Sequence, residues 1–419
     1  MLTPVEHLDG LKRLDIRFSL GPISRLLERL NKPQNAYGTV LVGGTNGKGS
    51  IAAMIASALS HGGFHVGLYT SPHLIDVRER IRIDGEMISR EDMNAWAEIV
   101  KANSLEDLTY FEFLTAIALL YFHVRKVDLA ILEVGMGGRL DATNVVSPLV
   151  SVVSNISFDH TEYLGGRLEE ITWEKAGIIK NGGVCINAVK QRRLQKLLEV
   201  ISRRRGSTLY SLGREIAVNA HTDGSFSYRG IGRRYDNLVC SLKGRHQIDN
   251  AAVALGVIEV LAMKGFPISD DAIFRGILDV RWEGRLEVIK HSPMVLLDGA
   301  HNTDGASALA CALREEFAYK KLIFIFGVLR DKDNKAMLEK LLPLGDRLIL
   351  TRPDTERAMP PEELLPVAKQ HVRKIEVVID PCEALELALS MADENDLICV
   401  TGSLYLIGEI KKAFSVVSL

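Results

Sequence analysis

The sequence has few cysteines, few aromatic residues and no marked excess of either charge. The cysteines are Cys185, Cys240, Cys311, Cys382 and Cys399. They show no C-x-x-C spacing and lie in apolar surroundings, which favours buried, reduced thiols and a cytoplasmic location. The net charge of -2 provides no general attraction to nucleic acids or anionic membranes. Residues 1–15 lack the apolar core of a signal peptide, and no segment is apolar enough to span a bilayer.

What the chain does have is a repeated order of strand then helix. Its 419 residues exceed one ordinary core, so two or three domains are expected. The run TVLV (39–42) precedes an apolar helical segment, and the runs VDLAILEVG (127–135) and LVSVVSNIS (149–157) are short and rich in β-branched residues. Such strands are typical of a parallel sheet that helices cover on both faces.

The pattern changes in the second half of the chain. Residues 206–242 contain short polar strands with glycine turns and predict antiparallel hairpins, after which a helix is expected over 246–265. The α/β alternation restarts after residues 280–290, where we expect a domain boundary. The predicted fold is therefore a P-loop-type, mostly parallel sheet domain with a small antiparallel β addition (1–284), followed by a Rossmann-like α/β domain (285–419).

The run GGTNGKGS (43–50) lies between a predicted strand and a predicted helix. It departs from the Walker spacing, because Val42 stands where a glycine is usual and Gly49 separates Lys48 from Ser50. Glycine amides and a helix N-terminus nevertheless form an anion site, and Lys48 can lie along the phosphates. The alternative is a tight turn with a lysine that faces solvent; the order of strand, glycines, lysine and helix favours phosphate binding.

Acidic and imidazole groups follow two other predicted strands. Glu133 ends one strand, and Asp159 and His160 come after the next. The carboxyl ends of parallel strands meet at one edge of a sheet, so these groups are expected to converge beside the phosphate loop. Hard oxygen ligands and substrate phosphates suit Mg²⁺. Taken singly, Glu133 is better explained as a helix cap or structural pair, and His160 as a structural histidine; their expected convergence favours the metal site.

Eight motifs in order now carry a resemblance that spans nearly the whole chain. They are GTNGKGS, YTSPHL, LEVGMGGRLDATN, DHTEYLG, WEKAGIIK, GRHQIDNAAVA, WEGRLE and LLDGAHN. Together they resemble folylpolyglutamate synthase and its bifunctional bacterial form with dihydrofolate synthase activity, a family similar to the Mur ligases. In this family the loop has the form GxxGKG[ST], so the spacing of the loop here is the family's own.

The resemblance implies roles for individual residues. Lys48, Glu133, His160 and Lys175 would be catalytic. Metal ligands would be Ser71 and Glu133 for one Mg²⁺, and Glu133 with His160 for a second, with Lys175 carried as a carbamate. The implied nucleotide-binding residues are Gly44, Thr45, Asn46, Gly47, Lys48, Gly49, Ser50, Asn250, Arg285, Asp298 and His301. The cofactors would be ATP and two Mg²⁺ ions, with a monovalent cation left open.

The implied reaction is ATP-dependent amide formation through an acyl phosphate that the amine of L-glutamate attacks. Phe111, Asp141 and Arg82 are the implied contacts of the pterin-containing substrate, dihydropteroate or a reduced folate, although core packing explains Phe111 equally well. The resemblance further implies a monomer that acts on small molecules and binds neither nucleic acid nor membrane. Two alternatives stay open: tail extension alone, or a Mur-type ligase for another carboxylate. The set of His160 and Lys175 and the lack of a basic stripe argue against a non-enzymatic ATP-dependent switch or a nucleic-acid module.

Overall fold

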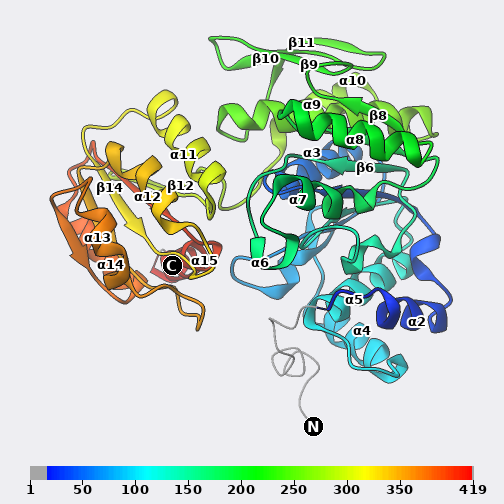
Figure 1. Cartoon of the computed structure of the whole chain (residues 1–419), viewed down its shortest axis with the longest axis horizontal. Coiled ribbons are helices and arrows are strands. Elements are labelled where there is room, and N and C mark those ends of the chain that lie inside the picture. The colour runs from blue at the N-terminus through cyan, green and yellow to red at the C-terminus, as the bar shows by residue number, and fades with distance from the viewer. Residues whose placement is uncertain (1–16, 418–419) are drawn as a thin grey trace.

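The computed structural model describes residues 17–417, with side chains described as far as residue 414. Figure 1 shows two lobes side by side: an N-terminal lobe, blue to green, and a C-terminal lobe, yellow to red. The expectation of no signal peptide concerns residues 1–15, which lie outside the described range. Among the described helices, none has the length and apolar character needed to cross a membrane.

The N-terminal lobe is built on an eight-stranded sheet in the order β4-β3-β2-β5-β1-β6-β7-β8. Six neighbouring strands, from β2 to β8, run parallel, and β3 and β4 add an antiparallel edge. The strands are β1 (Gly38–Gly43), β2 (Val66–Tyr69), β3 (Ile81–Ile83), β4 (Glu86–Met87), β5 (Leu129–Glu133), β6 (Val150–Val153), β7 (Val184–Asn187) and β8 (Thr208–Ser211).

Strand β8 corrects one detail of the sequence prediction. Thr208–Ser211 was grouped with the antiparallel hairpins, but it pairs parallel to β7 and closes the main sheet. The reason is the connection: helix α8 (Arg192–Arg204) carries the chain from β7 back over the sheet, and such a crossover brings the next strand in parallel. The antiparallel addition therefore begins only at residue 217.

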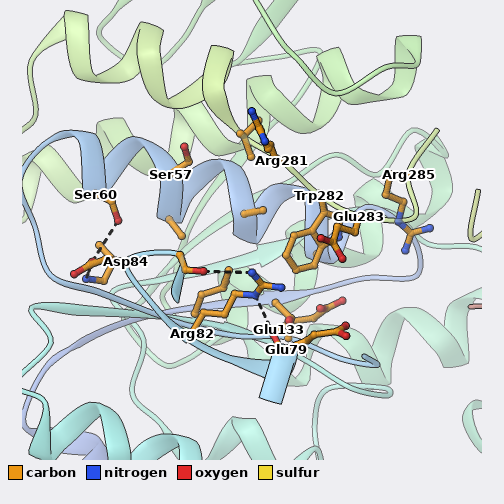
Figure 2. A pocket seen from close by; sticks show the side chains of 18 of the residues that line it. Ser57, Ser60, Glu79, Arg82, Asp84, Glu133, Arg281, Trp282, Glu283 and Arg285 are labelled. Atoms are coloured by element: carbon orange, nitrogen blue, oxygen red, sulfur yellow. Dashed lines mark hydrogen bonds between the residues drawn. The ribbon is translucent and has the colours of Figure 1, made fainter. Parts of the chain in front are cut away.

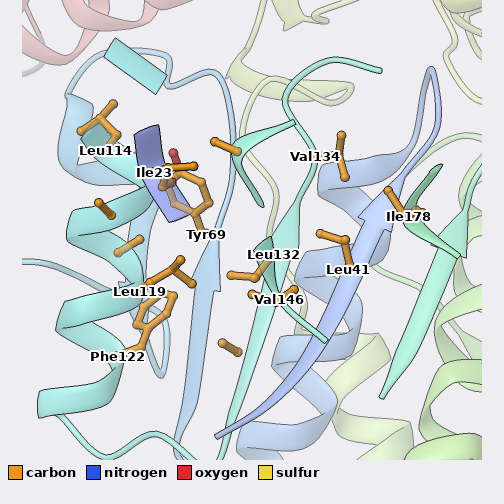
Figure 3. Packing of buried hydrophobic residues seen from close by; sticks show 14 of the residues in the cluster. Ile23, Leu41, Tyr69, Leu114, Leu119, Phe122, Leu132, Val134, Val146 and Ile178 are labelled. Carbon is orange, nitrogen blue, oxygen red and sulfur yellow. The ribbon is translucent and has the colours of Figure 1, made fainter. Parts of the chain in front are cut away.

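Two hydrophobic cores cover the two faces of this sheet. The helices that pack on one face contribute buried side chains to one core, and the helices on the other face contribute to the second core. Figure 3 shows Leu119 and Phe122 of α5 directed at Tyr69 and Leu132 of the strands. The helices on the first face are α2 (Gly21–Arg29), α4 (Arg90–Asn103), α5 (Tyr110–Val124), α7 (Leu168–Lys175) and α8; those on the second face are α3 (Lys48–His61), α9 (Arg245–Met263) and α10 (Asp270–Asp279).

A small antiparallel sheet lies beyond α9 at the top of Figure 1. Its strands are β9 (Ala217–Ala220), β10 (Ser225–Arg229) and β11 (Arg234–Val239). The buried carboxylate of Glu259 on α9 accepts hydrogen bonds from the Tyr228 hydroxyl (2.6 Å) and from the Gly232 and Arg233 amides (2.6 and 2.9 Å). One acidic side chain thus attaches the β10–β11 turn to the helix.

The C-terminal lobe contains a six-stranded sheet in the order β12-β13-β17-β14-β15-β16. Its strands are parallel except for the edge strand β12. The strands are β12 (Glu287–His291), β13 (Met294–Leu297), β14 (Leu322–Phe326), β15 (Arg347–Leu350), β16 (Ile375–Val377) and β17 (Leu397–Thr401). Helices α11 (Thr303–Glu315), α12 (Asn334–Leu341) and α13 (Pro361–Ala368) cover one face, and α14 (Pro381–Met391) and α15 (Leu404–Val417) cover the other.

The predicted fold class is confirmed: a mostly parallel N-terminal sheet, a small antiparallel addition and a separate α/β sheet at the C-terminus. Residues 280–286 connect α10 to β12, and we keep the proposed domain boundary after residue 284. Loops that follow β1 and β6 in one lobe contact loops that follow β13 and β14 in the other. Both sheets therefore direct the carboxyl ends of their strands at a shared interface, where ligands of open α/β sheets bind.

Candidate functional site

The phosphate loop predicted from the sequence connects β1 to the N-terminus of α3. Gly44 and Gly47 have φ angles of +133° and +80°, a conformation that favours glycine. A Cβ on Gly44 would stand 1.9 Å from the Ser154 hydroxyl oxygen, so no larger residue fits there. The Lys48 ammonium donates a hydrogen bond to the Thr45 carbonyl at 3.0 Å. The lysine thus folds back over its own loop, where a phosphate would lie.

Glu133 ends strand β5 and lies opposite Val42 of β1 in the sheet register. Its side chain is buried, and one carboxylate oxygen accepts a hydrogen bond from the Ser71 amide at 3.0 Å. Burial raises the pKa of Glu133, although the nearby Lys48 charge opposes the shift. The sheet therefore places a largely desolvated carboxyl group beside the phosphate loop, with Ser71 next to it.

His160 follows β6 at the N-terminus of the short helix α6 (Thr161–Leu164), with a φ of +51°. Burial is the main cause that lowers the pKa of His160 to about 4, and the charges of Lys332, Lys48 and Lys175 act in the same direction. The imidazole is neutral at pH 7, the form that binds metal ions.

Lys175 ends helix α7 and is buried in the N-terminal lobe. Its ammonium donates a hydrogen bond of 2.8 Å to the carbonyl of Gly44 in the phosphate loop. Burial, and secondarily the charge of Lys48, lowers the pKa of Lys175 to about 7. The structure therefore brings Lys48, Glu133, His160 and Lys175 to one edge of the sheet, although they come from four separate motifs.

A cavity of about 320 Å³ lies between the two lobes above this edge. Of the predicted nucleotide-binding residues, six line it: Asn46, Gly47, Ser50, Asn250, Arg285 and Asp298. His301 does not line this cavity; its imidazole instead lies 3.7 Å from Asp159. Residues not anticipated from the sequence complete the lining, among them Lys190, Gln191, His246, Gln247 and Asp249.

A second cavity, of about 450 Å³, runs along α3 to the same edge and is shown in Figure 2. Ser71, Arg82, Glu133 and Arg285 line it, so Arg285 borders both cavities. Trp282 also lines it and approaches the phosphate loop so closely that a Cβ on Gly49 would stand 2.8 Å from the indole nitrogen. Trp282 belongs to the WEGRLE motif. The sequence therefore marked this segment as part of the family pattern, but it did not predict that the tryptophan lies against the phosphate loop.

Phe111 and Asp141 do not line the second cavity, unlike Arg82. The Phe111 ring is partly buried, 5.9 Å from the Tyr69 ring, and a Cβ on Gly135 would stand 2.7 Å from it. The Asp141 carboxylate accepts hydrogen bonds from the amides of Met136 (2.9 Å) and Thr143 (3.0 Å), and burial raises its pKa. Both residues thus contact the 135–143 loop.

Comparison with known proteins gives a consistent result over the whole chain. The Mur ligase middle domain matches residues 42–258, and the Mur ligase glutamate ligase domain matches residues 284–404. A dihydrofolate synthase/folylpolyglutamate synthase of Bacillus subtilis is 34% identical over 97% of both chains, and a folylpolyglutamate synthase of Lacticaseibacillus casei is 35% identical over 93% of both. The structure of E. coli FolC in complex with DHPP and ADP superposes with a TM-score of 0.91 at 30% identity, covering 99% of this chain and 97% of that one.

The chain belongs to the folylpolyglutamate synthase/dihydrofolate synthase family of Mur ligases. The family predicted from the eight motifs is confirmed. Residues 259–283, which neither Mur ligase domain covers, include α10 and Trp282.

The donor set of this Mur ligase fits Mg²⁺. Within residues 17–417, no three His, Cys, Asp or Glu side chains gather into a metal-binding group. Mg²⁺ does not require one, because it is usually held by one or two carboxylates together with waters and substrate phosphates. Glu133 offers a hard oxygen ligand next to the phosphate loop and Ser71, and His160 is neutral. Lys175 cannot be a metal ligand in its ammonium form, because an ammonium group cannot bind a cation.

Proposed function

We propose that the protein is an ATP-dependent ligase that joins L-glutamate to the carboxylate of dihydropteroate and to the γ-carboxylate of folates that already carry glutamate. The observation that carries the proposal is the shared edge itself. A phosphate loop, the buried carboxyl of Glu133 and a cavity completed by Arg285 and Asp298 of the second lobe meet there, in a chain of this family. Both reactions need the same acyl phosphate and the same incoming amine, so one edge serves both.

Each residue has a role in that reaction. The loop amides and Lys48 hold the ATP phosphates in the first cavity, and Arg285 lines both this cavity and the second one. Glu133, Ser71 and His160 would hold Mg²⁺, which neutralises phosphate charge during transfer when it is bound. The two lobes exclude water, because an acyl phosphate that meets water is lost as free carboxylate.

Lys175 enters the proposal as a carbamate. Its pKa of about 7 leaves a large fraction of the amine neutral at physiological pH, and the neutral amine is the form that reacts with carbon dioxide. The carbamate replaces the buried ammonium with an anionic oxygen donor close to the Gly44 carbonyl, where a cation bound by Glu133 or His160 would balance its charge.

The two acceptors are proposed to approach the edge along different routes. Dihydropteroate would lie against the 135–143 loop, near Phe111 and Asp141. A relative with two named activities and one with a single named activity are similarly identical to this chain, at 34% and 35%. From the family resemblance, the proposal also includes a cytoplasmic monomer, which size-exclusion chromatography tests for oligomeric state.

The test is direct. Purified protein is incubated with ATP, Mg²⁺ and glutamate, and with either dihydropteroate or a reduced folate, and the products are identified by mass spectrometry. We expect both acceptors to gain one glutamyl residue, with ADP formed in equal amount. ADP formation that does not depend on glutamate would contradict the ligase proposal. Extension of folates without any product from dihydropteroate would leave tail extension as the single activity, and turnover of neither acceptor would point to a Mur-type ligase with another substrate.

A further inference from the structure

The carboxylate of Asp159 lies at the interface between the lobes and collects groups from the C-terminal one. The Lys332 ammonium lies 2.5 Å from one oxygen, and both side chains are almost fully buried, with 6% and 7% of their surface exposed. The Asn302 amide nitrogen lies 3.4 Å from the other oxygen, and the His301 imidazole lies 3.7 Å from it. Three residues of one lobe thus converge on a single acidic side chain of the other.

Lys332 reaches Asp159 from a braced loop. Leu329 pairs with Ala358 in an antiparallel bridge, so the loop after β14 is tied to the loop after β15. The Arg357 guanidinium forms an ion pair of 2.8 Å with Asp331, the residue before Lys332. The loop therefore presents Lys332 in a fixed position, which reduces the conformational entropy that the contact with Asp159 would otherwise lose.

The same group of contacts reaches the phosphate loop. Asn302 and Asn46 form a reciprocal pair, with amide nitrogen to oxygen distances of 2.8 and 3.2 Å. Asn302 also caps helix α11 by accepting a hydrogen bond from the Gly305 amide at 2.9 Å. We call Asn46, Asp159, Asn302 and Lys332 the interdomain clasp. It links the tip of the phosphate loop to the first turn of a helix in the other lobe.

A buried ion pair of this kind depends on the arrangement of the two lobes. When the lobes meet, Lys332 and Asp159 compensate each other's loss of water; when the lobes part, each is hydrated separately. A variant that keeps one charge and removes its partner therefore opposes the closed arrangement. By contrast, Lys411 pairs with Glu283 and Glu287, which lie in and next to the segment that connects the lobes.

We propose that Lys332 and Asp159 are positioning residues that hold the C-terminal lobe closed over the phosphate loop and keep water away from the acyl phosphate. The inference rests on the proposed ligase function for its catalytic consequence. Lys332 acts through Asp159 and the Asn302–Asn46 pair. It sets how often the two halves of the site meet, and so it controls how much ATP is used per amide bond formed.

The test compares Lys332→Met with Lys335→Met in the full-length protein. Lys335 lies three residues away on α12, is largely exposed, and faces Glu339 at 4.0 Å. Its substitution therefore removes the same charge from the same segment without changing the clasp. Lys332→Arg keeps the charge. The first measurement is small-angle scattering with and without a non-hydrolysable ATP analogue, which reports closure and requires no turnover. The second is the ratio of ADP to amide product.

We expect Lys332→Met to scatter as a more extended particle with the analogue bound. If about a tenth of the molecules remain closed, the apparent KM for glutamate rises about tenfold. ADP should then exceed amide product, while Lys335→Met behaves as the wild type and Lys332→Arg recovers most of the coupling. Equal ADP and product together with wild-type scattering in Lys332→Met would overturn the clasp.

A folding defect has its own control. If Lys332→Met does not fold, Arg357→Met loosens the loop while leaving both clasp charges in place, and a smaller change in the same two measurements is expected. An unchanged profile in a folded Arg357→Met protein would then count against the clasp. If the wild type ligates no glutamate, the proposed function fails, and the scattering comparison still decides whether Lys332 holds the lobes together.

Discussion

The two sheet edges that meet at the interface hold their charged groups in different ways. On the N-terminal edge, the ammonium groups of Lys48 and Lys175 both bond to carbonyls of the phosphate loop, and the pKa values of Lys175 and His160 are lowered by burial. On the C-terminal edge, Asp298 is hydrogen-bonded to the amides of Leu286 and Ala300 within its own lobe. The N-terminal edge thus gathers two lysines whose hydrogen-bond partners there are carbonyls, whereas the buried carboxylate of Asp298 has amide donors in its own lobe.

The difference indicates a division of work. An edge that directs the buried Lys175 and the partly buried Lys48 at the phosphate loop is stabilised by an anion, and a triphosphate supplies one. The C-terminal edge contributes residues that close over that anion, and Lys332 finds its carboxylate partner in the opposite lobe. Substitutions on the N-terminal edge should therefore stop the reaction, whereas substitutions at the contact between lobes should slow or uncouple it.

The largest effect is expected from Lys48→Ala. Loss of one preorganised cation at the phosphates should lower kcat by at least about a hundredfold to a thousandfold. The fold should persist, because the ammonium contacts its own loop at Thr45. Steady-state turnover and a thermal melt measure the two expectations, with Lys264→Ala, an exposed lysine at the end of α9, as the control. Near-normal turnover in folded Lys48→Ala protein would contradict the assignment of this loop as the phosphate-binding site.

Lys175→Ala should come next, with a loss of about tenfold to a hundredfold, as for other groups that support a metal site. A small carboxylate added to this variant should restore part of the activity. In the wild type, activation by bicarbonate should increase from about pH 6 to about pH 8, because the amine loses its proton as the pH passes its lowered pKa of about 7. A crystal structure with nucleotide and metal that shows a free ammonium at Lys175 would contradict the carbamate.

Asp141→Ala tests the acceptor routes within the N-terminal edge. Its carboxylate holds the 135–143 loop through Met136 and Thr143, and losing a buried charged hydrogen bond costs roughly 1.5–3 kcal/mol. We expect dihydropteroate turnover to fall by about tenfold or more and tail extension to fall less. Asp141→Asn keeps the shape of the side chain and serves as the matched control. Equal losses of turnover for dihydropteroate and for folates would show that both acceptors reach the site along the same route.

The smallest effect is expected from Gly408→Ala at the contact between lobes. A Cβ there would stand 2.2 Å from the Leu74 carbonyl oxygen, a backbone atom that cannot turn aside. The strain should separate α15 from the loop at Leu74 and cost about 1–3 kcal/mol, shared between lower stability and poorer closure. Gly166→Ala, where a Cβ meets nothing within 4 Å, is the control. An unchanged melting temperature together with an unchanged KM for glutamate would show that the contact does not matter.

Much of this molecule was predictable because its signals are local. The alternation of short apolar strands with helices predicted both sheets, and the phosphate loop was recognised from glycines, a lysine and their place before a helix. Glu133 and His160 were placed together by one rule, since the carboxyl ends of neighbouring parallel strands share an edge. The prediction that was wrong concerned β8, whose polar sequence resembles a hairpin strand although a helix crossover makes it parallel.

What the sequence by itself determined is the chemistry of each group and its position along a strand or helix. The tertiary structure decided which groups meet across large distances in the chain: Asn46 with Asn302, and Asp159 with Lys332. It also decided that Lys175 is buried, and hence that its pKa is lowered. The physical reason is that secondary structure follows from neighbours along the chain, whereas desolvation and ion pairing depend on what packs around a side chain, and Lys332 lies in no motif that would reveal its partner.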